Sequence, residues 1–419
     1  MGNGHGPGRH PAVVHPESLE CTACGKRHEV RLENLCECGG PLFARHNLAG
    51  VRVEDLRPRR DLWRYAPLLP LDEPAIRSRG EGGTPLLRLE RIGSGGRVAR
   101  LKVAALFVKD EGRNPTGTFK ARGMAVAVPM ARSLGAERIV APTAGNAGAA
   151  LALYAATYGI EATVLTTPDA PAGAIREALA HGARVAQVRG DIVRAGGIAR
   201  ELAAVTGAFS VATLREPYRV EGKKTMLYEI WDDLGGMPDW ILFPTGGGTG
   251  IAGIWKALQE LRDLGWYEGP WPRLGVVQAV GCAPLVRAWK EGRDHAEAWP
   301  SPTTRAAGLR VPSTLADRIV LQALRETDGV GVEVTEEAMS LAAANLAALE
   351  GISACLEGAA TLAGLRRLYD EGAITSKDRV VLVNTGTARE GDEATRPAVP
   401  TVESGEDALA KLELTSRAS

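Results

Sequence analysis

The sequence predicts an α/β protein with two doubly wound domains on mainly parallel sheets, and three observations support this fold class. Short β-branched runs such as "RIVAPT" and "WILFPT" precede glycine-rich loops. Alanine-rich helical segments follow these loops, as in "AGAALALYAATYG". Glycine is abundant, with 50 of 419 residues, whereas aromatic residues make up only 5%. Alternating strands and helices are typical of parallel sheets with helices on both faces, and glycine allows loops to approach a ligand closely.

Length and charge narrow the class of protein. A chain of 419 residues fits two domains and can bury a sizeable core. Lys plus Arg and Asp plus Glu both number 50, so no net field attracts nucleic acid or an anionic membrane. No apolar run reaches membrane-spanning length, and the first residues lack the apolar core of a signal peptide. We therefore expect a cytoplasmic protein that binds neither nucleic acid nor membrane.

The two ends of the chain are predicted to be flexible tails. Gly, Pro and His dominate residues 1–17. Residues 395–419 also lack an apolar period, apart from a short possible helix near Ala408–Leu414. Such segments cannot bury enough apolar surface to order themselves.

Four cysteines define a small segment at 18–45. Cys21 and Cys24 form a CxxC pair, Cys36 and Cys38 form a CxC pair, and a glycine follows each pair. Four thiolates in two close pairs can surround a tetrahedral zinc ion, so we predict a zinc-ribbon-like segment. A reduced knuckle without metal is the alternative. A redox-active CxxC is disfavoured because no strand and helix surround it.

From about residue 80 the strand–helix pattern begins. Ligands of parallel α/β folds bind at the carboxyl ends of strands, where this chain has its unusual loops. Pro129 should kink or end the helix that follows Lys120. Further buried strands are expected in "EATVLTTP", "RVAQVRG", "RLGVVQAVG" and "RVVLVNTGT".

The loop "PTGGGTG", Pro244 to Gly250, predicts an anion-binding cradle. Consecutive glycines let backbone N–H groups converge, and the following helix adds its positive end, which suits a phosphate. The loop is neither a Walker loop nor a GxGxxG motif with a ribose-binding acid. A tight turn between strand and helix is the alternative, although three consecutive glycines cost backbone entropy.

A second loop, "PTAGNAG" from Pro142 to Gly148, has the same design. Thr143, Gly145 and Asn146 offer donors at a helix start, although a simple Asn-Gly cap would explain them too. Two such loops suggest two anionic groups, for example a cofactor phosphate and a substrate carboxylate. A third segment, "NTGT" at 384–387, ends the last core strand, and on its own a plain turn explains it equally well.

Lys120 lies between a glycine–threonine turn and an apolar helix. Its neighbours Thr118, Phe119, Ala121 and Met124 indicate partial burial, which lowers the pKa of an amine and makes it a nucleophile. With a phosphate cradle nearby, the natural electrophile is the aldehyde of pyridoxal phosphate. A helix-cap lysine is the alternative.

Taken together, these segments resemble the fold type II pyridoxal-phosphate enzymes, the tryptophan synthase β family, and within it they are most similar to the threonine synthases. The resemblance covers residues 80–392, and a four-cysteine segment also precedes some threonine synthases. It implies a cofactor in the cleft between two domains and a homodimer. The region 80–215 would contain the smaller domain and the Schiff-base lysine, and 216–394 would be the larger domain with the phosphate loop.

The resemblance also assigns roles to single residues. "KDEGRNPTGTFKARGM" resembles the family's Schiff-base segment, which implies that Lys120 holds the cofactor next to Phe119. Asn146 would touch the phenolic oxygen of the cofactor, and Thr385 would lie beside its pyridine nitrogen. The substrate carboxylate would bind at Thr143, Ala144 and Gly145. The cofactor phosphate would bind at Gly246, Gly247, Gly248, Thr249 and Gly250.

The implied reaction converts O-phospho-L-homoserine and water to L-threonine and phosphate, by γ-elimination and β-replacement. Lys120, once displaced by the substrate amine, would act as the base near the Cα proton. A hydroxyl such as Thr385 does not protonate the pyridine nitrogen, which favours elimination and replacement. The leaving phosphate needs a second anion site, in or near "TLREPYRVEGKKT". The candidates are Arg219, Lys109 and Thr213.

Three features depart from the threonine synthase pattern and leave other activities open. Ala121 occupies a position where many threonine synthases have Asp, and Glu216 one where many have Asn. A carboxylate there would repel a phosphorylated substrate, although Arg215 and Arg219 could offset it. The triple glycine also resembles threonine and serine dehydratases. A dehydratase or another β-replacing enzyme is therefore the alternative, and a non-catalytic homologue is a third, which the intact Lys120 argues against.

Overall fold

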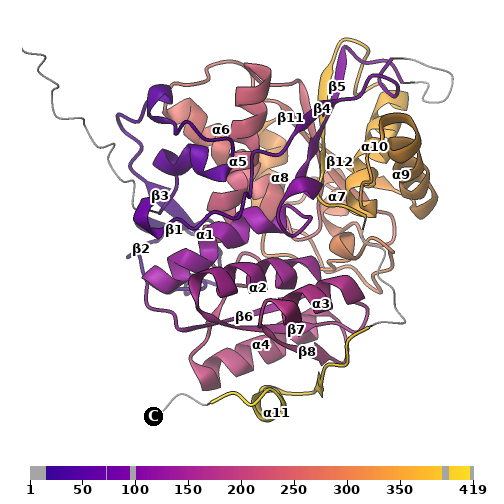
Figure 1. Cartoon of the computed structure of the whole chain (residues 1–419). Helices are drawn as coiled ribbons and strands as arrows, with labels where there is room; N and C mark the ends of the chain where they lie inside the picture. The colour runs from indigo at the N-terminus through magenta and orange to yellow at the C-terminus, as the bar shows by residue number, and fades with distance from the viewer. Residues whose placement is uncertain (1–15, 72, 95–100, 389–395, 416–419) are drawn as a thin grey trace, which may run out of the picture.

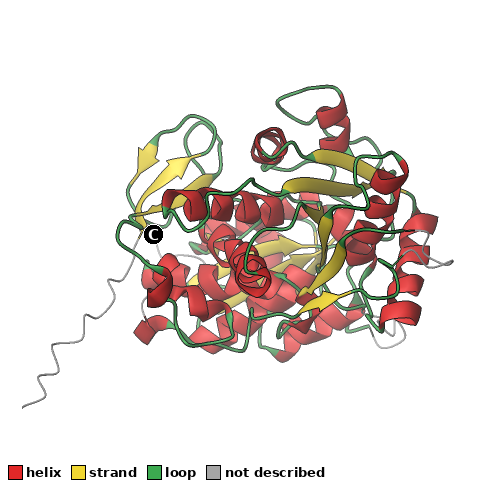
Figure 2. Ribbon diagram, turned by 90° about the horizontal axis from the view of Figure 1, so that it is seen from above, coloured by secondary structure: helices red, strands yellow, loops and turns green. Residues whose placement is uncertain are grey.

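The computed structural model describes residues 16–71, 73–94, 101–388 and 396–415. Two α/β parts lie one above the other, and a small antiparallel sheet stands at one side of them (Figures 1 and 2). Across those ranges, no helix is both long enough and apolar enough to span a membrane. The predicted α/β class with mainly parallel sheets is confirmed.

The N-terminal module, residues 16–46, is a three-stranded antiparallel sheet in the order β2-β1-β3. Pro16 and Glu17 already belong to its first strand, so the predicted tail ends earlier than residue 17; residues 1–15 lie outside the described residues. Short 3-10 turns follow the module toward the larger parts. The bounds are β1 Pro16–Cys21, β2 Arg27–His28, β3 Leu42–His46, η1 Val53–Asp55, η2 Leu62–Leu68 and η3 Glu73–Ala75.

The larger sheet has the order β12-β11-β10-β13-β5-β4, and only β4 runs antiparallel to its neighbour. Alternate residues of its strands face opposite sides. Ile241 and Val381 pack against α5, α6 and α8, whereas Leu242 and Leu382 pack against α9 and α10. The strands are β4 Leu86–Arg88, β5 Ala105–Asp110, β10 Trp240–Pro244, β11 Arg273–Ala279, β12 Val330–Val334 and β13 Arg379–Asn384. The helices and 3-10 turns are η4 Glu111–Arg113, α5 Tyr218–Leu234, α6 Thr249–Asp263, α7 Pro284–Lys290, η5 Ala307–Leu309, α8 Asp317–Glu326, α9 Glu336–Glu350 and α10 Leu356–Asp370.

The smaller sheet is entirely parallel and has the order β14-β8-β7-β6-β9. One face packs against α1, α2 and α3, and the other against α4 and α11. In Figure 1 this sheet lies in the lower part of the molecule. The elements are α1 Lys120–Ser133, β6 Arg138–Thr143, α2 Asn146–Tyr158, β7 Glu161–Thr166, α3 Ala172–Ala180, β8 Arg184–Val188, α4 Ile192–Thr206, β9 Phe209–Ser210, β14 Thr401–Val402 and α11 Gly405–Lys411.

The prediction of a flexible tail at 395–419 is wrong for its described part, 396–415. Val402 lies in β14, which pairs with β8, and Ala408 lies in α11; both side chains are fully buried. Ser404 caps α11 by accepting a hydrogen bond from the Asp407 amide. The short helix expected near Ala408–Leu414 corresponds to α11. A few apolar side chains suffice here because β14 pairs with the edge strand β8 and α11 covers a face of the smaller sheet.

Two further expectations need correction. The region 80–215 contains four of the five strands of the smaller sheet, but the fifth, β14, lies outside it, and β4 and β5 within it belong to the larger sheet. The helix after Lys120 does not end at Pro129 but continues to Ser133. Proline removes one hydrogen bond from a helix, and the residues around it, from Met124 to Ala131, are buried, so packing holds this helix together.

A buried group of charges joins α1 to the larger sheet. Arg122 is fully buried and forms ion pairs of 2.6 Å with Glu111, after β5, and with Glu229 of α5. Lys109 pairs with Glu229 at 2.9 Å. Burial alone would raise the pKa of the Glu229 carboxyl, but the charges of Arg122 and Lys109 lower it to about 2. The cluster therefore fixes the start of α1 against β5 and α5.

Replacing Arg122 with Met should lower the free energy of unfolding by about 3–5 kcal/mol, because two buried carboxylates lose their arginine partner and only Glu229 keeps another cation, Lys109. Urea denaturation at pH 7 measures this, and Arg113→Met, at an exposed arginine in the same region, is the control. Because the Glu229 pKa is depressed below its usual 4.5, its stabilisation is present above pH 4.5 and lost as the pH falls toward 2. That acid-side loss should be smaller in Arg122→Met. Equal stability of the two variants would contradict the prediction.

Candidate active site

The predicted loops lie at the two places where the strand order of a sheet reverses. In the smaller sheet the chain runs outward from β6 through β7 to β8, while β9 lies on the other side of β6. In the larger sheet it runs from β10 through β11 to β12, while β13 lies on the other side of β10. Ligands bind where the strand order reverses, beyond the carboxyl ends of the strands. The carboxyl ends of β6, β9, β10 and β13, with the loops and helix starts that follow them, carry Thr143–Asn146, Thr213, Gly246–Gly250 and Thr385.

Lys120 begins α1, and the segment before it pairs with the strand end that carries Thr385. The Phe119 amide donates to the Thr385 carbonyl at 3.0 Å, and Thr118 pairs with Gly386. The Lys120 ammonium lies 4.6 Å from the centre of the Phe119 ring. Burial, and then the charge of Arg219, lowers the pKa of Lys120 to about 8, although Glu357 opposes the shift. The structure therefore supports the prediction of an activated amine.

The glycine loop after β10 is closely packed. Gly248 has φ +77° and directly precedes α6. A methyl group on Gly246 would lie 2.1 Å from the Gly308 carbonyl oxygen, and one on Gly250 would lie 2.1 Å from the Phe243 ring. Packing thus requires these glycines, in addition to any ligand. Thr249 is the first residue of α6, so the backbone N–H groups of the loop lie at a helix N-terminus, which favours an anion.

The loop after β6 ends at the start of α2. Gly145 has φ +135° and donates its amide to the Thr143 hydroxyl at 3.0 Å, across Ala144. Asn146 is the first residue of α2, and its Oδ1 is buried without a hydrogen-bond partner among the described residues. A buried amide oxygen without a partner is costly, and a bound ligand could satisfy it.

Thr385 has a thiol neighbour that the sequence did not reveal. The Cys355 sulfur lies 3.8 Å from the Thr385 hydroxyl, and burial raises the pKa of this thiol. Cys355 caps α10, accepting a hydrogen bond from the Gly358 amide. It lies 30 residues before Thr385, outside every quoted motif, so only the fold brings the two residues together.

Arg219 has buried hydrogen-bond donors that no described residue satisfies. It is 2% exposed, and its Nη1 donates to the Val211 carbonyl at 2.9 Å and the Thr213 hydroxyl at 3.4 Å. Its Nε and Nη2 have no partner among the described residues. Burial lowers the pKa of Arg219, while Glu216 opposes the shift. Two buried guanidinium nitrogens whose N–H groups find no acceptor among the described residues form a site for an anion.

Lys223 is a second amine that sequence reasoning did not assign to the site. It follows Arg219 by one turn of α5, is fully buried, and lies 3.3 Å from the centre of the Phe119 ring. Burial and the charges of Lys120 and Arg219 hold the pKa of Lys223 well below its usual value. The i, i+4 spacing from Arg219 was the available signal.

Lys109 does not serve as an anion ligand, so that candidate is wrong. Its buried ammonium already donates to the Thr84 carbonyl at 2.6 Å and pairs with Glu229 and Asp233. An ammonium has three hydrogens, and three acceptors already engage them. The sequence around Lys109 does not reveal these ion pairs, because Glu229 and Asp233 lie on α5, far away in the sequence.

Glu216 has a local role that reduces its expected conflict with an anionic substrate. Its carboxylate accepts hydrogen bonds from the amides of Tyr218, at 2.7 Å, and Arg219, at 3.1 Å, at the start of α5. Burial raises the pKa of Glu216 to about 7, although the charge of Arg219 and these hydrogen bonds oppose it. Near pH 7 the group therefore carries only part of its negative charge.

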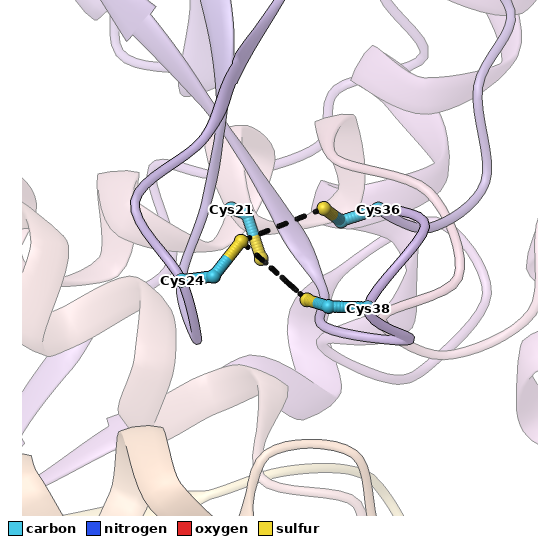
Figure 3. A group of neighbouring side chains, drawn as sticks. All are labelled: Cys21, Cys24, Cys36 and Cys38. Atoms are coloured by element: carbon cyan, nitrogen blue, oxygen red, sulfur yellow. Dashed lines mark hydrogen bonds between the residues drawn. The ribbon is translucent and has the colours of Figure 1, made fainter.

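The four cysteines of the N-terminal module converge as predicted (Figure 3). The Cys21–Cys38 and Cys24–Cys38 sulfur pairs are 3.5 Å apart, and Cys24–Cys36 are 3.7 Å apart. Sulfurs around a tetrahedral zinc, each about 2.3 Å from the metal, lie about 3.8 Å apart. The arrangement therefore fits a closed four-thiolate metal site.

The residues at the two strand-order reversals also fit pyridoxal phosphate. They comprise one primary amine with a lowered pKa, a glycine loop at a helix N-terminus, and a hydroxyl at the end of β13. The unpartnered Oδ1 of Asn146 can accept a hydrogen bond from a ligand, and the unpartnered Nε and Nη2 of Arg219 can donate to an anion. The donor set thus matches an aldehyde-bearing phosphate and an amino acid.

Comparison with known proteins agrees with this donor set. A family model described as "Pyridoxal-phosphate dependent enzyme" matches residues 77–386. The chain is 35% identical to the threonine synthase of Methanosarcina acetivorans, over 89% of this chain and 91% of that protein. It is 34% identical to the threonine synthase of Methanocaldococcus jannaschii, over 87% and 91%.

Solved structures have the same fold. Maize serine racemase superposes with a TM-score of 0.63 at 22% identity, covering 73% of this chain and 88% of that one. A threonine deaminase from "T.th." gives a TM-score of 0.57 at 25% identity, covering 73% and 93%. With this fold and these relatives, the threonine synthases among them, the chain belongs to the family of pyridoxal-phosphate dependent enzymes of fold type II.

Proposed function

We propose that the protein is a threonine synthase, which converts O-phospho-L-homoserine and water to L-threonine and phosphate by γ-elimination and β-replacement. The observation that carries the proposal is Arg219: its Nε and Nη2 are buried without a partner among the described residues, and its charge lowers the pKa of Lys120. A second phosphate site of this kind is what a phosphorylated substrate requires. The threonine synthases that align with most of this chain support the same reaction.

Each residue that would hold the cofactor has a distinct role. Lys120 would hold it through its amine, and the N–H groups of Gly246–Gly250 would hold its phosphate. Asn146 would contact its phenolic oxygen, and Thr385 would offer a hydroxyl to its pyridine nitrogen. When bound, pyridoxal phosphate supplies the electron sink for breaking bonds at the substrate's Cα. The cofactor would lie between the two sheets, where the loops of both converge.

The substrate is held at both of its ends. Thr143, Ala144 and Gly145 bind the carboxylate with the donors at the start of α2. Arg219 binds the side-chain phosphate, with Thr213 beside it. Lys120 moves the Cα proton, because burial lowers the pKa of its amine and so favours the free base that accepts a proton. Lys223 adds positive potential next to Phe119.

A threonine or serine dehydratase is the second candidate. The structural similarity to a threonine deaminase favours it, and a dehydratase uses the same cofactor residues without a second phosphate site. It would form 2-oxobutanoate or pyruvate and release no phosphate. Product analysis therefore separates the two activities.

Three further properties of the protein are part of this proposal. They are a structural zinc ion at the four cysteines, a homodimer, and a role in amino-acid biosynthesis in the cytoplasm. Because four thiolates leave no open coordination position, the zinc would not take part in catalysis. Sedimentation analysis tests the dimer.

The purified protein should be yellow, and borohydride reduction with peptide mapping should place the pyridoxyl group on Lys120. Lys120→Ala should abolish the visible absorbance band. Lys223→Ala is the informative control, since Lys223 is the other amine beside Phe119, and it should keep the band. With cofactor-free protein, the rate of attachment should rise with pH around a midpoint of about 8, above which Lys120 is a free amine. A pyridoxyl label on Lys223 would overturn the assignment.

Arg219→Ala should lower kcat/KM for O-phospho-L-homoserine by about 10- to 100-fold, because charge-assisted hydrogen bonds contribute about 1.5–3 kcal/mol each. Cofactor affinity should stay normal. Arg200→Ala, at an exposed arginine of α4, serves as the control, and phosphate release and threonine formation are the assays. If the wild-type enzyme releases no phosphate but forms 2-oxobutanoate from threonine or pyruvate from serine, the dehydratase function replaces the proposal.

Protein made under reducing, metal-replete conditions should contain one zinc per chain by elemental analysis. Cys24→Ser with Cys38→Ser should remove it, since two of four ligands are lost, and should lower the melting temperature. Cys282→Ala, at a buried cysteine outside the module, should keep the zinc. Wild-type protein without stoichiometric zinc would favour the metal-free knuckle instead.

A further inference from the structure

One side chain joins the N-terminal module to the loop between β9 and α5. Asn34, which lies between the two cysteine pairs, donates its amide Nδ2 to the carbonyl of Ser210 and to that of Arg215, both at 2.8 Å. Ser210 ends β9, and Arg215 lies three residues before α5. A single amide thus bridges both ends of the 210–215 loop.

The bridged loop has an unfavourable backbone conformation. Leu214 has φ +57°, in the left-handed region, and its side chain is 1% exposed. A bulky residue rarely adopts this conformation, which persists only where the surrounding structure holds it in place. The two hydrogen bonds of the Asn34 amide restrain the loop in this conformation from outside it.

The same loop supplies the acceptors that orient Arg219. Nη1 of Arg219 donates to the Val211 carbonyl and the Thr213 hydroxyl. Arg215, Glu216 and the start of α5 follow directly. If the loop relaxed, the unpartnered Nε and Nη2 of Arg219 would lose their fixed direction.

The module itself is firmly anchored beside α5 and α6. The buried His46 ring is 2.7 Å from the Glu221 carboxylate, and Lys256 donates to the Ala44 carbonyl at 2.6 Å. Both contacts are buried, so the module provides a fixed base from which Asn34 reaches the loop.

We propose that Asn34 is a positioning residue for the substrate's anionic side chain: it holds the strained 210–215 loop and thereby directs Arg219. The N-terminal module thus contributes to substrate affinity through its contact with this loop. The inference rests on the proposed role of Arg219 as the phosphate ligand.

The test compares Asn34→Ala and Asn34→Asp with Arg31→Ala, at an exposed residue of the same module that pairs with Glu33. Asp keeps the size of Asn but loses both donors.

In both Asn34 variants, KM for O-phospho-L-homoserine should rise about 5- to 30-fold, as expected for two lost hydrogen bonds. The inhibition constant of inorganic phosphate should rise by the same factor. The value of kcat should change less than about threefold. Cofactor affinity and zinc content should match the wild type, and amide hydrogen exchange should accelerate at residues 211–215.

Arg219→Ala, measured in parallel, separates the two possible failures. If Arg219→Ala weakens phosphate inhibition and the Asn34 variants stay within about twofold of wild type, the positioning role is wrong and the proposed function stands. If Arg219→Ala leaves phosphate inhibition unchanged, the proposed anion site fails, and this inference fails with it. A loss of cofactor affinity in the Asn34 variants that matches the rise in KM would show a general structural effect and would also overturn the proposal.

Discussion

The buried guanidinium of Arg122 is the interaction on which the rest of the site depends. A buried charge must be paired, and its partners Glu111 and Glu229 lie after β5 and on α5. This pairing holds α1 against both elements. Two glycines allow the close approach, since a methyl group on Gly222 would lie 1.8 Å from the Arg122 carbonyl oxygen and one on Gly123 would lie 3.1 Å from that of Arg219. Lys120 and Arg219 therefore face one ligand region from two helices.

Several positively charged side chains lie in that buried region, where the dielectric constant is low. Lys120, Lys223 and Arg219 lie close together, and after burial itself the neighbouring positive charges depress the pKa values of both lysines. Such a group costs free energy in the ligand-free protein and favours any ligand that brings negative charge. A cofactor phosphate, a substrate carboxylate and a side-chain phosphate would each bring some. The same physics explains why an amine here becomes nucleophilic near neutral pH.

The fold shows the surroundings of two residues, Glu216 and Ala121, that depart from the threonine synthase pattern. Glu216 accepts hydrogen bonds from the first two amides of α5, and its raised pKa weakens the repulsion that its charge would cause. Ala121 is fully buried in α1, where a larger side chain would need space. The N-terminal module contacts the same substrate-side loop through Asn34. The residues proposed to determine substrate specificity thus come from segments far apart in the chain.

The sequence by itself determined the α/β class, the glycine loops, Lys120 and the four-cysteine module, because each of these depends on residues that lie close to one another along the chain. The tertiary structure alone decided what depends on distant partners. It removed Lys109 from the ligand set by pairing it with Glu229, brought Cys355 next to Thr385, and ordered residues 401–411 against the smaller sheet. Strand order decided which loops meet, since a local pattern predicts a strand but not its neighbours, and a buried side chain's role is set by the partners that packing supplies.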